Sequence, residues 1–222
     1  MNIADNINRY LSEIGPRRCK LVAISKTKPV SIILEAYHAG HRIFGENRVQ
    51  ELVEKQAKLP HDIEWHMVGH LQTNKVKYIA PFVGLIHSVD SVKLIKEINR
   101  QGSKYNRSIS CLLQVHIAEE ETKFGLSEEE LYQLLEEVTH SGYKNIKIAG
   151  LMGMATYTDN EEVIRREFRY LKKILEAVSV KYRNELFNMK ELSIGMSGDY
   201  KIAIEEGSTM IRIGTGVFGS RH

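Results

Sequence analysis

The feature that most constrains this chain is a regular alternation of two hydrophobic patterns. Short apolar runs rich in β-branched residues, which are typical of strands, alternate with longer stretches of helical period. The helical period is clearest over residues 130–138 and 163–178. Eight runs are predicted to be strands, at residues 21–25, 42–44, 64–68, 85–89, 109–117, 146–152, 191–194 and 210–213. A helix after nearly every strand indicates repeated βα units around a parallel sheet, and therefore an α/β fold.

Two arrangements of these units are compatible with the alternation, a closed (β/α)8 TIM barrel and an open doubly wound sheet. The 222 residues give about 28 per unit, near the lower end of the roughly 200 to 400 residues of such barrels. No linker or shift in composition divides the chain. We therefore predict one barrel domain over residues 1–222. Residues 1–18 form an N-terminal helix and lead-in, with an apolar pattern of Ile3, Ile7, Leu11 and Ile14.

Composition argues against several classes of function. Lys and Arg number 31 against 28 Asp and Glu, and the resulting net charge of +3 is too small and too evenly spread to favour nucleic-acid binding. The longest uncharged stretch, 78–89, falls short of the roughly 20 apolar residues of a membrane span. We expect a cytoplasmic protein. Cys19 and Cys111 match no metal or redox spacing, so we expect both to be free, buried thiols.

Functional residues are expected at the carboxyl ends of the strands, where both arrangements place their sites. Val22, Ile24 and Lys26 share one face of the first strand. If that face points into a barrel, Lys26 lies at the rim of an apolar interior, where desolvation favours a neutral and nucleophilic amine. Lys28 has the same parity, but it lies beside a helix start marked by Pro29. An ordinary surface lysine is the alternative for either residue.

The C-terminal part of the chain is rich in glycine, with six of the 16 glycines in the last 28 residues. They lie in loops after the seventh and eighth strands, at 193–199 and 212–216. In barrels these loops often bind phosphate through exposed backbone N–H groups, whereas the alternative is that the glycines serve tight turns. Neither loop has a nucleotide-binding motif. His66 and His70 do not share a helical face as a metal pair requires, so we expect a structural role for them.

A reactive lysine after strand one and a phosphate cradle after strands seven and eight together suggest pyridoxal 5′-phosphate. The chain closely resembles the YggS/PROSC family of pyridoxal phosphate homeostasis proteins from about residue 20 to its end. The segments that carry this resemblance are LVAISKTKP (21–29), FGENRVQE (44–51), WHMVGHLQTNK (65–75), GLMGMAT (150–156), SIGMSGDY (193–200) and GSTMIRIGTGVFG (207–219). That family is similar to the N-terminal barrel of alanine racemase, which favours the closed barrel.

The resemblance implies roles for individual residues. It makes Lys26 the lysine that forms a covalent Schiff base with pyridoxal 5′-phosphate, and Lys28 a neighbour that does not. It places Arg212 opposite the pyridine nitrogen. The other implied cofactor residues are Ser197, Gly214 and Thr215 at the phosphate, and Asn47 and Met152 along the pocket. Small departures from the family pattern occur at Val68, His70, Gly198 and Gly216, and they concern the shape of loops.

The resemblance further implies a non-catalytic protein of intracellular cofactor homeostasis, which buffers pyridoxal phosphate or delivers it to apo-enzymes. An arginine facing the ring nitrogen leaves it unprotonated and weakens the ring as an electron sink. Lys26 supplies one acid or base where racemisation needs two, and the length leaves no room for a racemase's second domain. The alternative is a pyridoxal phosphate-dependent amino-acid racemase of weak activity, and a phosphosugar isomerase is third. We expect a monomer.

Overall fold

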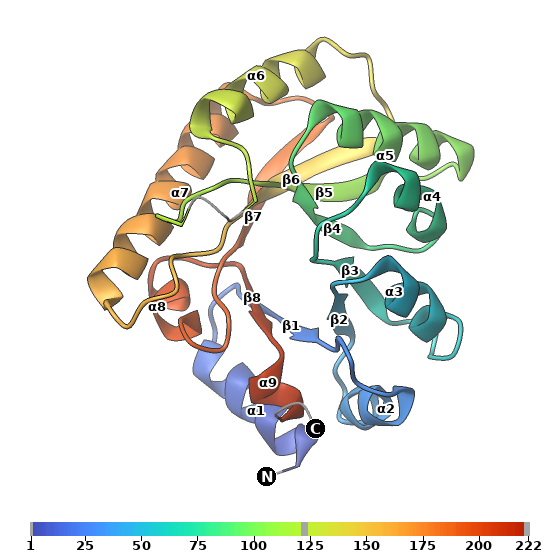
Figure 1. Ribbon diagram of the computed structural model, residues 1–222, viewed down its shortest axis with the longest axis vertical. Helices are drawn as coiled ribbons and strands as arrows, with labels where there is room; N and C mark the ends of the chain where they lie inside the picture. Colours follow the sequence, from blue (N-terminus) through green and yellow to red (C-terminus); the bar gives the residue numbers. More distant parts are fainter. Residues whose placement is uncertain (1, 121–123, 220–222) are drawn as a thin grey trace.

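The closed barrel is confirmed by the computed structural model, which describes residues 2–120 and 124–219. Within these residues eight parallel strands pair in chain order and β8 returns to β1, so the open sheet is excluded (Figure 1). The helices surround the strands on the outside. The strands are β1 Lys20–Ile24, β2 Ile43–Glu46, β3 Glu64–Met67, β4 Leu85–Val89, β5 Ile109–Gln114, β6 Ile146–Met152, β7 Phe187–Ser193 and β8 Met210–Ile213.

Most helices begin where their sequence offers a start signal. Ser127 opens one with a reciprocal capping box to Glu130, Ser91 caps another by accepting from the N–H of Leu94, and Pro29 is the N-cap residue of a third. The helices are α1 Ile3–Ile14, α2 Val30–His38, α3 Val49–Gln56, α4 Val76–Ile79, α5 Val92–Lys104, α6 Glu128–Thr139, α7 Glu161–Lys181, α8 Tyr200–Glu205 and α9 Thr215–Phe218, with a 3-10 turn η1 at Thr73–Lys75.

Three of the eight predicted strands have shifts of only one or two residues at their ends, whereas the fifth and the seventh differ by three or more. The fifth ends at Gln114 rather than at 117, because the N–H of His116 bonds to Leu126 in the following loop instead of to a neighbouring strand. The seventh begins at Phe187 rather than at 191. Its early residues Asn188 and Lys190 point to solvent between buried Phe187 and Met189, which breaks the continuous apolar run that identified the other strands.

Apolar side chains form two layers, one between the strands and the helices and one inside the barrel. The large outer layer includes Phe44 and Phe168, both fully buried. The small inner layer consists of Val22, Ile24, Leu85, Leu112, Met152 and Met210. Each fully buried aliphatic side chain stabilises the fold by roughly 1.5–3 kcal/mol. Val22 and Ile24 lie in the inner layer, so the inward orientation expected for the face of β1 that leads to Lys26 is confirmed.

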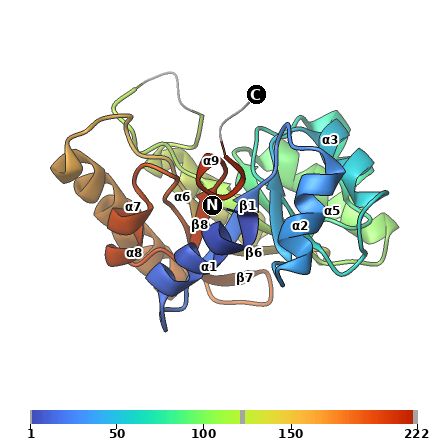
Figure 2. The same cartoon turned by 90° about the horizontal axis from the view of Figure 1, so that it is seen from below.

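The N-terminal helix packs beside the end of the chain, as Figure 2 shows for α1 and α9. The Asn6 side chain donates to the Val217 carbonyl oxygen at 3.0 Å. Tyr10 is buried against Gly216, where an added Cβ would collide with the phenol oxygen. The expectation that Leu11 belongs to the buried face is wrong, since it is 45% exposed and Tyr10 takes its place. The other three expected positions are buried.

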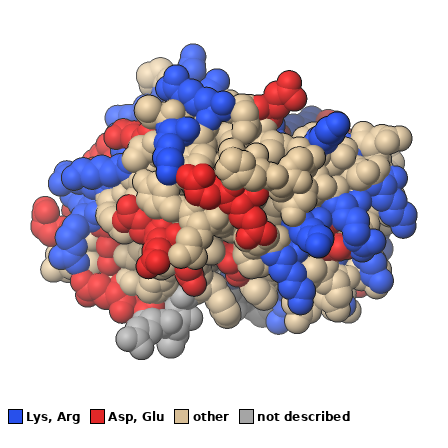
Figure 3. Space-filling view, turned by 90° about the horizontal axis from the view of Figure 1, so that it is seen from above, with Lys and Arg blue, Asp and Glu red and all other residues tan. Residues whose placement is uncertain are grey.

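The surface carries both signs of charge interspersed, and Figure 3 shows neither sign covering its whole face. Among the described helices, none is both long and apolar enough to cross a bilayer. The two cysteines are unbonded, as predicted; Cys111 is buried, whereas Cys19 is only partly so. Burial raises the pKa of Cys111 to about 12 and that of Cys19 to about 11, so both stay protonated thiols at neutral pH.

Candidate functional site

One cavity at the carboxyl ends of the strands collects all the residues that the sequence pointed to. It has a volume of about 310 Å³, at the lower end of the range for small-molecule sites. The seven predicted residues lie in its lining: Lys26, Asn47, Met152, Ser197, Arg212, Gly214 and Thr215. Ile24, Val68, Met154, Met196 and Gly198 complete the lining. The structure thus brings the predicted set together, while the role of each residue in binding stays a prediction.

Lys26 lies two residues beyond the end of β1 and is half-buried beside Ile24 of the inner layer. The next residue, Thr27, has a φ of 66°, a left-handed conformation that β-branched residues rarely adopt. Its N–H donates to a Glu51 carboxylate oxygen at 2.8 Å. Such backbone strain persists only where surrounding contacts enforce it. Among the described lining residues Lys26 is present and Lys28 is not, which agrees with the preference for Lys26.

A buried ionic cluster on the outer side of the barrel holds the segment that carries Lys26. Lys55 of α3 donates to the Ser25 carbonyl oxygen at 2.8 Å, to Glu46 at 2.7 Å and to Glu51 at 3.1 Å. The Ser25 hydroxyl also donates to Glu46, at 2.6 Å. Desolvation raises the pKa of Glu46 above its ordinary value, although Lys55 and Ser25 oppose this. We call Ser25, Glu46, Glu51, Thr27 and Lys55 the outer network.

Arg212 of β8 projects into the barrel with its guanidinium group in the cavity wall. It donates to the Ser193 carbonyl oxygen at 2.8 Å, to the Ser193 hydroxyl at 2.7 Å and to the Gly153 carbonyl oxygen at 3.1 Å. Complete burial lowers the pKa of Arg212 to about 10, so the group is still protonated at neutral pH. A guanidinium can only donate hydrogen bonds. Any ligand atom in front of it must therefore be an acceptor.

The donors around the cavity fit pyridoxal 5′-phosphate. Ser197 offers a hydroxyl group from the loop after β7, and Thr215 offers one as the first residue of α9. Both are exposed to solvent. Nothing beyond its chain neighbours lies within 4 Å of the position of a Cβ at Gly198, so there is open space at this point of the loop after β7. Met152 supplies an apolar wall for a ring. The cavity thus combines three kinds of group that this cofactor requires. They are an amine for its aldehyde, hydroxyls for its phosphate and a hydrogen-bond donor for an unprotonated ring nitrogen.

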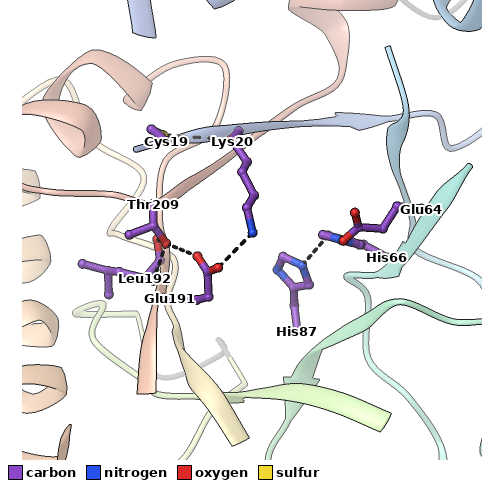
Figure 4. Close-up of polar contacts among 8 residues, drawn as sticks. All are labelled: Cys19, Lys20, Glu64, His66, His87, Glu191, Leu192 and Thr209. Atoms are coloured by element: carbon purple, nitrogen blue, oxygen red, sulfur yellow. Dashed lines mark hydrogen bonds and ion pairs between the residues drawn. The ribbon is translucent and has the colours of Figure 1, made fainter. Parts of the chain in front are cut away.

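Below the cavity, four inward side chains continue the polar contacts of Arg212 through the barrel. The Ser193 hydroxyl lies 3.0 Å from His87 Nδ1, and His87 Nε2 lies 2.9 Å from His66 Nδ1. His66 Nε2 lies 2.9 Å from Glu64, at the amino end of β3. Figure 4 shows the two imidazoles pointing toward each other across the interior. We call Glu64, His66, His87, Ser193 and Arg212 the inner network.

The structural role expected for His66 agrees with its place in the inner network, whereas His70 lies elsewhere. His70 is exposed, stacks on Phe124 with ring centroids 5.2 Å apart and lies 3.6 Å from an Asp90 oxygen. The two histidines thus lie in different environments. Over residues 2–120 and 124–219, no three His, Cys, Asp or Glu side chains are grouped as a metal site requires.

Sequence reasoning missed His87 and Ser193, and it gave Lys55 no role. The alternation that identified Lys26 could have indicated the first two, since His87 shares a face of β4 with Leu85, and Ser193 shares a face of β7 with Glu191. Lys55 carries no such signal, because on α3 it is simply four residues from Glu51 and reads as a surface ion pair.

Comparison with known proteins places this geometry in context. A sequence model described as the alanine racemase N-terminal domain matches residues 1–222. A pyridoxal phosphate homeostasis protein of Aquifex aeolicus is 40% identical over 231 residues, covering 100% of this chain and 99% of the relative. A human protein of that name is 37% identical, and the match covers 96% of this chain and 79% of the human protein.

Solved structures show the same relationship. PipY of Synechococcus elongatus without PLP is 35% identical and superposes with a TM-score of 0.90, covering 98% of this chain and 100% of that one. PipY with PLP bound gives a TM-score of 0.87. Alanine racemase of Streptomyces lavendulae is 13% identical with a TM-score of 0.80, and the match covers 57% of that enzyme. At that identity the likeness concerns the fold alone.

Proposed function

This chain belongs to the alanine racemase N-terminal domain family and, within it, to the pyridoxal phosphate homeostasis proteins, and from that premise we propose that it binds pyridoxal 5′-phosphate and buffers or delivers it. The observation that carries the proposal is the meeting of the seven predicted residues in one cavity. The relatives' name and the PLP-bound PipY structure support it.

We assign each predicted lining residue to one part of the cofactor. Bound in this cavity, the cofactor would supply an aldehyde that a lysine amine could hold as a Schiff base, with loss of one water molecule. We assign that amine to Lys26, since it is the lysine of the lining. Ser197, Gly214 and Thr215 receive the phosphate, and Met152 and Asn47 border the ring. Arg212 would donate a hydrogen bond to the ring nitrogen, which would then stay unprotonated.

The same lining favours a carrier over an enzyme. Racemisation removes a proton on one face of the substrate and returns one on the other, so it needs two acid–base groups. Within the described lining Lys26 is the side chain suited to that task, and the remaining members are apolar, amide, hydroxyl, glycine or guanidinium. An unprotonated ring nitrogen further weakens carbanion stabilisation. The exposed Ser197 and Thr215 give the solvent access that exchange of a carried cofactor requires.

The test compares Lys26→Ala with the matched control Lys28→Ala. We expect Lys26→Ala to abolish the visible absorbance of the Schiff base and to weaken cofactor binding by at least about tenfold, roughly 1.4 kcal/mol, whereas Lys28→Ala keeps both. Equilibrium dialysis and absorption spectra measure the two effects. If both variants behave as the wild type, Lys26 is not the attachment site and this assignment is wrong.

Carrier and enzyme are separated by two assays on the same wild-type preparation. A carrier activates a pyridoxal phosphate-dependent apo-enzyme by transfer and shows no racemisation of an amino-acid panel. Turnover that depends on Lys26, without transfer, would instead establish the weak racemase. The proposal also includes a monomeric state and a cytoplasmic location, which light scattering and cell fractionation test.

A further inference from the structure

The inner network is continuous from one end of the barrel to the other. It starts at Glu64, whose side chain is half exposed at the amino end of β3, and it ends at fully buried Arg212 beside the cavity. Each of its four links is a hydrogen bond of 3.0 Å or less. The three residues between the two ends are all buried, so no solvent competes for their hydrogen bonds. They are His66, His87 and Ser193.

The two ends of the network determine which atom donates at every step. Arg212 can only donate, so the Ser193 oxygen accepts from it and the Ser193 hydrogen is directed to His87 Nδ1. Neutral His87 then carries its proton on Nε2 and donates to His66 Nδ1. Neutral His66 likewise donates from Nε2 to Glu64, which as a carboxylate can only accept. All donors thus run in one direction, from Arg212 to Glu64.

The reverse order of donors, from Glu64 to Arg212, requires an additional proton and makes two donors face the Ser193 oxygen. If His87 carried its proton on Nδ1, the Ser193 oxygen would face two donors, and its own hydrogen would lose its acceptor. His66 would then need protons on both nitrogens to contact His87 and Glu64. That order would add a positive charge to an interior that already holds the buried guanidinium of Arg212. Figure 4 shows Lys20 in the same interior, where it lies 2.9 Å from Glu191.

The pKa shifts of His87 and Glu64 agree with a neutral His87 and an ionised Glu64. Desolvation is the main cause that holds the pKa of His87 well below its ordinary value, and the positive charges of Arg212 and Lys20 act in the same direction. At the other end, the hydrogen bond from His66 lowers the pKa of Glu64, although partial burial opposes this. Glu64 is therefore ionised and His87 is neutral at pH 7, as the one-directional order requires.

We propose that Ser193 and His87 are positioning residues that hold Arg212 in the orientation in which its remaining donors meet the cofactor's ring nitrogen. Ser193 holds the guanidinium through both its hydroxyl and its carbonyl oxygen, and His87 orients the hydroxyl. The part of this inference that concerns the cofactor rests on the proposed function. The order of donors in the ligand-free protein does not.

The order of donors is tested by nitrogen-15 NMR of the histidine side chains in the ligand-free protein at pH 7. We expect His66 and His87 both to be neutral and both to carry the proton on Nε2. Assignment follows from the loss of one signal set in His66→Gln and of the other in His87→Asn. A proton on Nδ1 of His87, or a doubly protonated ring at either position, would overturn the inference.

The positioning role is tested with matched pairs of variants loaded with pyridoxal phosphate. Ser193→Thr keeps the hydroxyl and Ser193→Ala removes it. His87→Asn keeps an acceptor near the Nδ1 position, whereas His87→Gln places its amide near the Nε2 position instead. We expect Ser193→Ala and His87→Gln to shift the visible band of the bound cofactor and to weaken binding by about tenfold, and their partners to stay close to the wild type.

Leu85→Ala is the structural control, because Leu85 shares the inward face of β4 with His87 and belongs to the inner apolar layer. We expect it to lower stability without moving the absorbance band. An equal shift in Leu85→Ala, or no shift in Ser193→Ala and His87→Gln, would show that positioning is not their role. A wild type that binds no pyridoxal phosphate would overturn the proposed function and the cofactor part of the inference, while the NMR result still decides the order of donors.

Discussion

The inner and outer networks both support the cavity, but they are built differently. The inner network has charged groups at its two ends, Glu64 and Arg212, and joins them through two imidazoles and a hydroxyl. The outer network concentrates its charges, since Lys55 contacts two carboxylates, and the side chains of Lys55 and Glu46 are only 9% and 0% exposed. A buried ion depends strongly on its partner, whereas a neutral hydrogen bond contributes direction at modest energy. We infer that the outer network chiefly stabilises the Lys26 segment and that the inner network chiefly orients Arg212.

The largest effect is expected when the outer network loses its cation. Lys55→Met leaves Glu46 buried without its partner and should lower the free energy of unfolding by about 3–5 kcal/mol. Urea unfolding at pH 7.5 measures this effect. Adding Glu46→Gln should recover part of the loss, because no buried charge then remains. Lys58→Met is the control, because Lys58 is exposed. If Lys55→Met lowered the free energy of unfolding no more than Lys58→Met does, the distinction between the networks would be contradicted.

His87 of the inner network and Glu46 of the outer network should also respond to pH with opposite sign. The folded-state pKa of His87 is depressed, so the unfolded state binds the proton first and stability is lost as pH falls below the ordinary value of 6.5. The slope per such histidine is about 1.4 kcal/mol per pH unit. His41, whose pKa is also lowered by burial, adds to the wild-type slope. Urea unfolding between pH 7.5 and 5.5 should therefore give a flatter profile in His87→Asn.

The pKa of Glu46 is shifted upward, whereas that of His87 is shifted downward. Because the folded-state pKa of Glu46 is raised, its contribution is present below the ordinary value of 4.5 and is lost as pH rises through the folded value. Removing the group with Glu46→Gln should therefore steepen the loss of stability on acidification. Slopes that change in the same sense in His87→Asn and Glu46→Gln would contradict the opposite pH dependence of these two groups.

The smallest effect is expected for an ion pair on the surface. Arg166 and Glu119 approach to 2.6 Å, but both side chains are 64% exposed. Exposed pairs contribute about 0–1 kcal/mol, so Arg166→Ala should change the unfolding free energy by less than about 1 kcal/mol. High salt should reduce even that difference. A loss approaching that of Lys55→Met would mean that burial does not set the strength of these networks.

The sequence allowed the barrel and the cavity residues to be predicted, but not the networks beneath them. The parity of β1 and its end located Lys26, because strand alternation is a local property. The contact of His87 with Ser193 joins strands far apart in sequence, and it depends on the stagger of the closed barrel, including register shifts after Ile86 and after Ile148. Lys55 turns inward only because of where α3 docks, which no local pattern encodes.

The most direct measurement is the mapping of the lysine to which the cofactor attaches. The purified protein is incubated with pyridoxal 5′-phosphate, reduced with borohydride, digested and analysed by mass spectrometry. We predict one reduced pyridoxyl phosphate group per chain, on the peptide that contains Lys26, and none in Lys26→Ala. An unmodified chain, or a label that stays in Lys26→Ala and maps to Lys28 or Lys55, would contradict the assignment of this cavity as the cofactor site.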